Sequence, residues 1–544
     1  MPHSVAIIAP MTDLEEQYHL DLVLKHKFSG RELTLATLQE LVQTGFNTNT
    51  LQPGHHREES IPAAGFYLSG LLRANGYDTH LSDKYDDNTL DQIAQNDPIA
   101  VCLSTTMVLS TNSLRRLIRQ IRKHLPKTCI IVGGVFVWKS YQAYRLSKDY
   151  EGHTDLLFQP DSLDIDADAY VVAPHGRDSL LEVLDKISSP GPLEPEDIPN
   201  LAFPTATGFS FTKRVSEHID YNKDITRWDL LDQLPGQIPV RTSVGCPFRC
   251  RYCDFYQLYP NIFLRSKESL VYELKLINAK LAGRPAIIHA TDDNVFINTK
   301  HVNDVTSAII ESGIQRWIGF MRASSINESN IEQIKKSGLL MSIIGVESGD
   351  QGQLERMNKA QKLPRVKRGI ELLDRRGITV MMTFIVGYPG ETTETIYNTA
   401  NFINSLDIGL ASSSYQLYPL VISPFSDLAT KKYRDQWGIQ GVLDQWSHYT
   451  MDSGQARQAG YDLFRQVTNV PYHYSQERTF YNREVFTDEQ RSNLFRLRHR
   501  LTSGYIDNHS ESDIHSVLVE ISRNLNRGSA DTGISIPEGI VLSG

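Results

Sequence analysis

The stretch that decides the fold is Gly245-Cys246-Pro247-Phe248-Arg249-Cys250-Arg251-Tyr252-Cys253-Asp254, in which three cysteines are spaced CxxxCxxC. It directly follows residues 238–244, a run that predicts a strand. A metal site that is coordinated fully by protein takes four ligands, whereas three cysteines around an iron–sulfur cubane leave one iron open to a ligand from elsewhere. The cysteine count therefore predicts a cluster with one open iron.

A structural zinc site is the main alternative for these thiols, and two buried cysteines beside an unrelated third are another. Zinc would need its fourth ligand from a distant histidine or acid, because no second CxxC arm is present and Asp254 does not complete a usual ligand pair. The spacing, the preceding strand and the motifs further along the chain agree on the cluster, which we therefore favour.

The segment closely resembles the cluster loop of the radical S-adenosylmethionine (radical SAM) enzymes. In that family the open iron binds the amino and carboxylate groups of SAM, and an electron from the cluster then releases a 5′-deoxyadenosyl radical. The resemblance implies that Cys246, Cys250 and Cys253 are the catalytic and metal-ligating residues of a [4Fe-4S] cluster, and that Tyr252 lies against the adenine. It also implies an external electron donor, such as flavodoxin or ferredoxin.

Further contacts to SAM are implied at strand ends downstream, where five residues match positions of this kind in the family: Asp292, Arg322, Gly345, Glu347 and Ser348. A guanidinium can hold the carboxylate of the methionine moiety by two hydrogen bonds, and a carboxylate such as that of Glu347 can accept hydrogen bonds from ribose hydroxyls. The acidic pair Asp292 and Asp293 occupies an amine-holding position, and the sequence leaves open which acid serves.

The first 190 or so residues alternate between strands and helices, which predicts a parallel, doubly wound (Rossmann-like) sheet. The predicted strands are 5–9, 79–82, 100–104, 129–132 and 169–172, and the predicted helices are 64–75, 113–124 and 180–187. Such sheets bind ligands at the carboxyl ends of their strands. The small residues there, which let a bulky ligand approach the backbone, are Ser104, Thr105, Thr106, Gly133 and Gly134.

This half of the chain resembles the cobalamin-binding domain that precedes many radical SAM enzymes. The matching pieces are 64–77, 103–105 and 131–134. The resemblance implies cobalamin at those strand ends, with no axial histidine from a DxHxxG motif, because the sequence has none. Residues 12–61 form a long insertion before the first helix. The alternative is a flavodoxin-like sheet without a cofactor that only supports the rest of the protein.

A regular rhythm of strands and helices returns after a Pro- and Gly-rich linker and a short lead-in strand at 198–203. The predicted strands are 240–244, 286–290, 317–321, 341–346, 380–386 and 414–417. Six such units predict the open, partial (β/α)6 barrel of the TIM type that is known for the radical SAM superfamily. Its active-site groups are expected at the carboxyl ends of the strands.

These patterns predict an α/β protein in four parts: a cobalamin-binding-like domain at 1–187, a linker with the lead-in strand at 188–237, the barrel at 238–428, and a mainly helical C-terminal region at 429–544. The last part carries no readable chemistry. Trp446, His448, Tyr449 and Met451, which follow the last barrel unit, could close the barrel or contact substrate, and His448 is more simply interpreted as a packed or exposed histidine.

The composition is that of a soluble protein, with 40% hydrophobic and 22% charged residues in 544. No run approaches the ~20 apolar residues of a membrane span, and the first ten residues do not resemble a signal peptide. Five cysteines, three of them in one motif, suit a reducing cytoplasm. The net charge of -9 makes nucleic acid an unfavourable partner. A small-molecule substrate is expected, and natural-product tailoring, lipid modification and peptide modification all stay open.

The resemblance implies a cobalamin-dependent radical SAM enzyme, most commonly one that methylates an unactivated carbon of a small molecule or natural-product intermediate. One SAM would methylate cob(I)alamin, a second would yield the 5′-deoxyadenosyl radical, and the substrate radical would take its methyl group from methylcobalamin. Other members of the family use the radical for cyclisation, ring rearrangement or oxidation, and the sequence does not separate these. A radical enzyme without cobalamin and a non-catalytic metal-binding interaction module are further alternatives.

Overall fold

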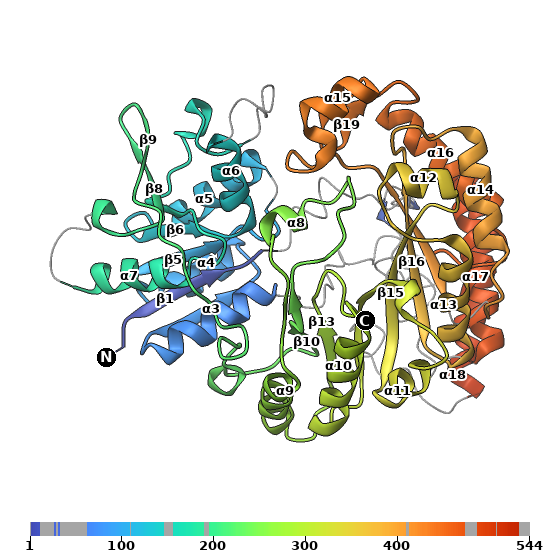
Figure 1. Cartoon of the computed structure of the whole chain (residues 1–544), viewed down its shortest axis with the longest axis horizontal. Helices are drawn as coiled ribbons and strands as arrows, with labels where there is room; N and C mark the ends of the chain where they lie inside the picture. The colour runs from blue at the N-terminus through green and yellow to red at the C-terminus, as the bar shows by residue number, and fades with distance from the viewer. Residues whose placement is uncertain are drawn as a thin grey trace.

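The computed structural model describes residues 2–10, 27–28, 31–32, 62–108, 110–145, 156–189, 195–409, 413–473, 487–507 and 509–531. Two large sheets built mainly of parallel strands dominate these residues, one in the N-terminal half and one in the middle of the chain (Figure 1). The insertion at 12–61 lies outside the described residues except for two short paired strands, β2 (Lys27–Phe28) and β3 (Arg31–Glu32).

The N-terminal sheet has the order β4-β1-β5-β6-β7-β8-β9, and its first five strands are parallel. Those strands are β1 (Ser4–Ile8), β4 (Asp78–Ser82), β5 (Ala100–Ser104), β6 (Cys129–Gly133) and β7 (Ala169–Val171). The helices are α3 (Ala63–Ala74), α4 (Asp87–Ala94), α5 (Thr111–His124), α6 (Val135–Arg145) and α7 (Arg177–Ser188). The predicted doubly wound sheet is confirmed, and the prediction lacked α4 and α6.

The sheet continues into two antiparallel strands, β8 (Leu201–Thr205) and β9 (Gly208–Phe211). The sequence analysis assigned the strand at 198–203 to a linker that leads to the barrel, which is wrong. Tyr170 of β7 pairs with Ala202, and the rings of Phe209 and Phe158 pack against Tyr170. These apolar side chains bury themselves on the N-terminal sheet, so the chain turns back before it enters the barrel.

The second sheet is the predicted partial barrel, with the order β10-β13-β14-β15-β16-β17 and all neighbours parallel. Its strands are β10 (Gln237–Val240), β13 (Ile287–Ala290), β14 (Trp317–Met321), β15 (Leu339–Glu347), β16 (Thr379–Val386) and β17 (Ser414–Pro419). The helices between them are α9 (Lys267–Leu281), α10 (Thr299–Ser312), α11 (Ile331–Lys336), α13 (Leu363–Arg375) and α14 (Thr393–Asn404).

The first barrel strand was predicted at 240–244 and lies earlier, at Gln237–Val240. Residues Ser243–Val244 form a separate short strand, β11, which pairs antiparallel with β12 (Phe263–Leu264). The single apolar run in the sequence therefore covers two strands, one in the barrel sheet and one that shapes the loop after it.

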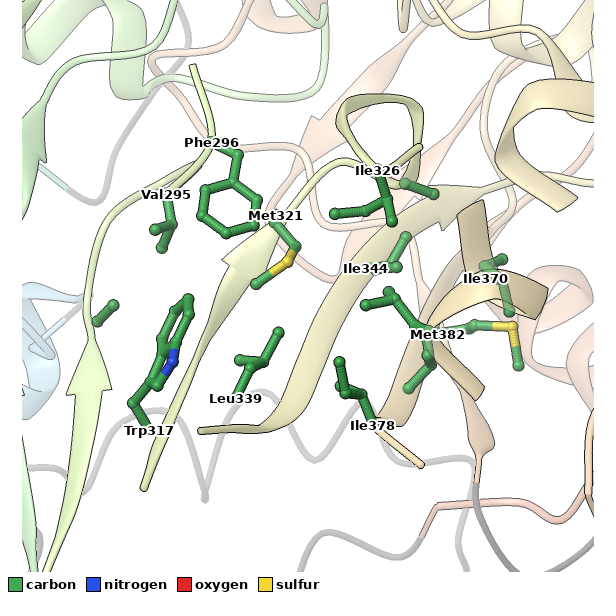
Figure 2. Close-up of a cluster of buried hydrophobic side chains, with 14 of the residues drawn as sticks. Val295, Phe296, Trp317, Met321, Ile326, Leu339, Ile344, Ile370, Ile378 and Met382 are labelled. Carbon is green, nitrogen blue, oxygen red and sulfur yellow. The ribbon is translucent and has the colours of Figure 1, made fainter. Parts of the chain in front are cut away.

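The barrel core lies between the sheet and its helices. Trp317, Ile344 and Met382 point from the strands into a cluster that also contains Ile370 of α13 (Figure 2). The Trp317 indole is fully buried, and its nitrogen donates to the Ser337 hydroxyl at 3.0 Å, so the ring brings no unpaired polar atom into the core. The result is a packed platform for the loops at the carboxyl ends of the strands.

The C-terminal region is mainly helical, as predicted. It contains α15 (Lys431–Trp437), a hairpin of β18 (Gln440–Val442) and β19 (Gln445–Ser447), α16 (Ser453–Gln466), α17 (Asp488–Ile506) and α18 (Glu511–Asp531). Helix α16 packs Leu463 and Phe464 into the barrel core, and α17 and α18 lie outside it, in orange and red (Figure 1). Among the described residues, no helix combines the length and apolarity that a bilayer crossing requires.

Candidate active site

The three cysteines lie on a loop whose two ends are held together by the pairing of β11 with β12. We call residues 245–262 the cluster loop. Val244 stands opposite Phe263 at its base. Gly245 has a φ of +81°, and a β-carbon there would lie 2.8 Å from the carbonyl oxygen of Asn261. Only glycine fits such a position without strain, so Gly245 allows the two ends of the cluster loop to lie close together.

The middle of the cluster loop is fixed to the segment that follows α12 (Gln351–Arg356). The side-chain amide of Asn358 donates to the carbonyl oxygen of Arg249 at 2.7 Å. Within the loop, the Cys253 amide donates to the Cys250 carbonyl oxygen at 3.0 Å. These bonds keep the second and third cysteines on one turn of chain.

The three thiols lie in partly or fully buried surroundings. Cys250 is buried, and Cys246 and Cys253 are half-buried. Burial raises the pKa of the Cys253 thiol to about 12 and also raises the pKa of Cys246. A thiol in such surroundings loses its proton only when a positively charged group binds the sulfur. The donor chemistry therefore fits ligands of a metal cluster and does not fit a free nucleophile.

The three thiols are not gathered around a position for one metal ion. Within the part of the chain that the structure describes, no three His, Cys, Asp or Glu side chains converge on a position for one metal ion. The thiolates of a zinc site all lie about 2.3 Å from the same ion. The thiolates of a cubane bind three different irons and need not converge. The preference for a cubane therefore rests on the CxxxCxxC spacing.

A buried polar triad lies at the carboxyl end of β15. The ammonium nitrogen of Lys359 is 2.7 Å from Glu347 Oε1 and 2.9 Å from the Tyr252 hydroxyl, which donates to Glu347 Oε1 at 2.9 Å. The Lys359 and Glu347 side chains are 8% and 10% exposed. Burial and the nearby carboxylate raise the pKa of Tyr252, so its hydroxyl stays protonated. Two predicted SAM contacts thus form one unit with Lys359, which the sequence analysis missed.

The backbone at Glu347 is strained. Its φ of +71° lies in the left-handed region, and the pairing register of β15 with β16 shifts between Gly345 and Glu347. A β-carbon on Gly345 would overlap the Glu347 carboxylate. Such strain costs about 1–3 kcal/mol and is typical of functional sites. The next residue, Ser348, is buried and accepts a hydrogen bond from the Asp350 amide at 3.1 Å, which closes the turn.

Arg322 follows β14 and contacts both the cluster loop and the triad. Its guanidinium carbon is 3.7 Å from the centroid of the Phe248 ring, and an NH2 group donates to the Lys359 carbonyl oxygen. The side chain is buried, and its Nε atom has no hydrogen-bond partner within the described residues. A buried donor without a partner fits an accepting group from outside the chain, such as the carboxylate predicted for this residue.

The two acids after β13, Asp292 and Asp293, have different surroundings. Both Asp292 oxygens accept from the Thr242 amide at 3.0 Å, and one also accepts from the Ser243 amide and, at 2.8 Å, from its hydroxyl. Asp292 was predicted as a cofactor contact, whereas its oxygens here hold the chain that enters the cluster loop. Desolvation of the Asp293 carboxyl and the negative charge of Asp292 raise the pKa of Asp293 to about 6.

The predicted cobalamin edge is lined by small residues. Ser104 Oγ and Thr106 Oγ1 lie 3.1 Å apart, while the amide and hydroxyl of Thr105 donate to the Gly133 carbonyl oxygen at 2.7 and 2.8 Å. Gly134 has a φ of +106°, and a β-carbon there would lie 2.9 Å from the Thr105 nitrogen. At Gly133 a β-carbon would make only an ordinary contact at 3.7 Å. Gly134 is therefore required by the fold, and Gly133 leaves room beside the backbone.

The aromatic residues of the C-terminal region pack on the turn after β16. The His448 ring lies 2.9 Å from the Gly387 carbonyl oxygen through Nε2 and stacks on the Trp446 ring at 4.9 Å. Both side chains are buried, whereas Tyr449 is 75% exposed. His448 is therefore a packed histidine that fastens the hairpin to the barrel.

Two family models match this chain. Residues 240–403 match the radical SAM superfamily, and residues 57–155 match the B12 binding domain. The chain contains a radical SAM domain preceded by a B12-binding domain. The first match includes the cluster loop and the triad, and the second includes the small residues at the carboxyl edge of the N-terminal sheet.

Proteins with similar sequences include an uncharacterized methyltransferase of Pyrococcus horikoshii, 27% identical over 174 residues, which are 32% of this chain and 38% of that protein. The anaerobic magnesium-protoporphyrin IX monomethyl ester cyclase of Rubrivivax gelatinosus is 23% identical over 391 residues, 68% of this chain and 65% of the cyclase. The chain thus spans less than two thirds of the length of either relative.

Two solved structures share the arrangement of this radical SAM protein. TsrM from Kitasatospora setae, a radical SAM methyltransferase solved with cobalamin and a [4Fe-4S] cluster, gives a TM-score of 0.52 at 18% identity and covers 79% of this chain and 77% of that one. The cobalamin-dependent SAM radical enzyme OxsB gives a TM-score of 0.55 at 14% identity, over 99% and 81% of the two chains. At these identities the likeness concerns the fold.

Proposed function

We propose that this protein is a cobalamin-dependent radical SAM enzyme that methylates an unactivated carbon of a small molecule. The observation that carries the proposal is that the carboxyl edge of the B12-binding domain faces the cluster loop. His175, which follows β7, has its ring 5.9 Å from the ring of Tyr259 in that loop, and its Nε2 is 2.5 Å from the Tyr221 hydroxyl. Ligands at the two edges would therefore meet in one space.

The residues around the cluster loop have the chemistry to bind SAM. Cys246, Cys250 and Cys253 would hold the cluster, which supplies the electron for cleavage of the sulfonium bond. Arg322 would use its unpaired Nε to hold the methionine carboxylate. Asp293 would hold the amino group, because the oxygens of Asp292 are already used by the backbone. Glu347 would accept hydrogen bonds from the ribose, with Lys359 and Tyr252 keeping its carboxylate in place.

The carboxyl edge of the N-terminal sheet would bind the corrin, which serves as a carrier of the methyl group. Gly133 leaves the backbone accessible, and the hydroxyls of Ser104 and Thr106 lie beside it as hydrogen-bonding groups. His175 does not provide a strong base here, because burial and the positive charge of Arg241 lower its pKa to about 4. The protein's contribution is to place the two cofactors and the substrate in line and to exclude water.

Cyclisation is the second candidate activity. It is favoured by the alignment with the magnesium-protoporphyrin ester cyclase, which covers 68% of this chain, whereas the alignment with the archaeal methyltransferase covers 32%. Both activities use the same cluster and radical, and they differ in whether a methyl group reaches the product. We place the protein in the cytoplasm, whose reducing conditions preserve free thiols.

An external electron donor is part of the proposal, and a group of cations near the cluster loop supports an acidic one. The Arg251 side chain donates to the Arg356 carbonyl oxygen at 2.7 Å, and its guanidinium carbon lies 5.1 Å from the centroid of the Tyr433 ring. The Lys432 ammonium nitrogen lies 5.2 Å from the centroid of the same ring, and Arg249 is exposed. Within the described residues, Arg249, Arg251 and Lys432 form no ion pair with a carboxylate, although the chain carries a net charge of -9. Reduction of the cluster by flavodoxin should therefore slow as salt is added, and a salt-independent rate would contradict this surface.

The experiment that tests the proposed function is anaerobic reconstitution with iron, sulfide and hydroxocobalamin, followed by desalting and metal analysis. About four irons and one cobalt per chain are expected, together with formation of 5′-deoxyadenosine from SAM after reduction. Four irons without cobalt would contradict the proposed methyl transfer and would still support radical chemistry at the cluster. Zinc without sulfide would overturn the proposal altogether.

A further inference from the structure

Helix α6 joins the B12-binding domain directly to the cluster loop. It begins just after Gly133 and Gly134, at the edge where the corrin is proposed to bind, and it lies next to α8 (Phe255–Leu258) of the cluster loop (Figure 1). The ammonium nitrogen of Lys139 on α6 is 2.5 Å from Asp254 Oδ2. Asp254 directly follows Cys253, so the ion pair ends one residue from a proposed cluster ligand.

The surroundings of this ion pair make it a junction of three parts of the molecule. The Lys139 and Asp254 side chains are 13% and 12% exposed. The Ser423 hydroxyl, from the loop after β17, donates to the same Asp254 oxygen at 2.5 Å. The Lys139 nitrogen also lies 5.4 Å from the ring centroid of Phe425 and 6.0 Å from that of Phe255. The N-terminal domain, the cluster loop and the last barrel loop therefore meet at Asp254.

The other ion pairs between the N-terminal domain and the rest of the described chain end elsewhere. Arg73 pairs with Asp232 at 2.6 Å and Arg177 pairs with Asp224 at 3.1 Å, and both acids lie in the segment that connects the two sheets. Asp232 is 78% exposed, so that pair is screened by water. Within the described residues, Lys139–Asp254 is thus the ion pair that fastens the N-terminal domain to the cluster loop itself.

A buried ion pair of this kind contributes more to geometry than to stability. Desolvation offsets much of the attraction, so the net stabilisation is small, whereas removal of one partner leaves an uncompensated charge. The geometry of the contact is also well defined, because one carboxylate oxygen of Asp254 accepts hydrogen bonds from both Lys139 and Ser423. Its effect is to fix the separation between the start of α6 and Cys253.

We propose that Lys139 is a positioning residue that sets the distance between the corrin site and the cluster. This inference rests on the proposed function, because it assigns the two ends of the ion pair to two bound cofactors. Transfer of a group between a corrin and a radical formed at the cluster requires a fixed geometry, and small displacements cost large factors in rate. In this role Lys139 acts through Asp254 and the backbone of α6.

The test compares Lys139→Gln, Lys139→Arg and the control Lys123→Gln, which removes an exposed lysine of an ion pair on α5. In the metal-free full-length chain, hydrogen exchange of α6 and of residues 253–258 should be faster by about tenfold in Lys139→Gln. It should be near wild type in Lys139→Arg and in the control. Equal exchange in all four proteins would overturn the proposal, and this arm does not depend on cofactor binding.

The second arm uses protein reconstituted with iron, sulfide and hydroxocobalamin and then reduced. Paramagnetic interaction between cob(II)alamin and the reduced cluster reports their separation. Lys139→Gln should retain iron and cobalt and show a weaker, broader interaction, which Lys139→Arg restores. An unchanged interaction in Lys139→Gln would refute the positioning role. Absence of cobalt from the wild type would instead refute the proposed function, so the two failures are distinguishable.

Discussion

The two proposed cofactor edges of this protein are built by opposite means. At the cluster edge, charged and hydrogen-bonding side chains are held tightly, as the ion pair of Lys359 with Glu347 and the left-handed backbone of Glu347 show. At the corrin edge, the side chains are the small ones of Ser104, Thr105 and Thr106, and Gly133 has none. The cluster edge thus specifies its ligands by chemistry, whereas the corrin edge specifies a large ligand by leaving space.

The strongest test of this comparison removes a cluster ligand from one edge and measures cofactor binding at the other. Cys250→Ala should abolish cluster assembly, because a cubane with two thiolates lacks a ligand that no other described residue supplies. Iron should fall from about four per chain to near zero. Cobalt should remain at the wild-type level, since the corrin edge belongs to another sheet. Wild-type cleavage of SAM by this variant would contradict the cluster assignment.

A second, smaller effect is expected from the triad. Lys359→Met leaves the buried Glu347 carboxylate without its cation, which should destabilise the protein by about 3–5 kcal/mol. The measurement is the urea midpoint of the metal-free chain. The control Lys362→Met removes a lysine that is 71% exposed in its pair with Glu355, and it should change stability by less than about 1 kcal/mol.

The double variant Glu347→Gln/Lys359→Met sharpens this prediction. It removes both charges, so most of the lost stability should return, while affinity for SAM should fall by about tenfold or more because the charged acceptor is lost. The cluster should still assemble, with unchanged iron content. Wild-type affinity for SAM would show that Glu347 does not contact the cofactor.

The difference between the two edges also explains how much the sequence could predict. The cysteines were found because they are neighbours in the chain, and the strands were found because their apolar residues form continuous runs. Lys359 was missed because it reaches Tyr252 from 107 residues away, and no local pattern marks that contact. The contact between Lys139 and Asp254, which are 115 residues apart, was missed for the same reason.

The misplaced strands have a related cause. The run at 198–203 has the composition of a strand, and composition does not say which sheet the strand will join. Its partner is decided by the burial of Ala202 against Tyr170, a tertiary contact. The different roles of Asp292 and Asp293 are likewise decided by a tertiary contact, because the Asp292 carboxylate is the one that accepts hydrogen bonds from the amides of Thr242 and Ser243. Sequence placed both acids in the site and could not separate their roles.

The corrin edge is tested by adding a side chain to it. A β-carbon at Gly133 meets its nearest neighbour at 3.7 Å, so the position tolerates the first atom of a side chain, and the further atoms of Gly133→Leu should obstruct cobalamin binding. Gly134→Ala is the contrasting variant: its φ of +106° and the 2.9 Å approach to the Thr105 nitrogen should lower stability instead. Cobalt content after reconstitution and the urea midpoint separate the two effects. Full cobalt uptake by Gly133→Leu would place the corrin elsewhere.

The last expected effect is on stability alone and concerns a buried acid that the proposed cofactor contacts do not use. Glu391, on the turn after β16, accepts a hydrogen bond from the Gly387 amide, and burial raises its pKa to about 8. Between the pKa of an unfolded glutamate, near 4.5, and pH 8, the folded protein holds a proton that the unfolded chain releases. Stability contributed by this site therefore falls as pH rises through that window and levels off above it.

Glu391→Gln removes the titration and keeps an oxygen that can accept from the Gly387 amide. Relative to wild type, the variant should therefore gain stability as the pH is raised from about 5 to about 8, by about 3.5 kcal/mol, with urea midpoints as the measurement. Iron and cobalt contents should not change. A constant difference between the two proteins across this range would show that Glu391 is ionised in the folded state despite its burial.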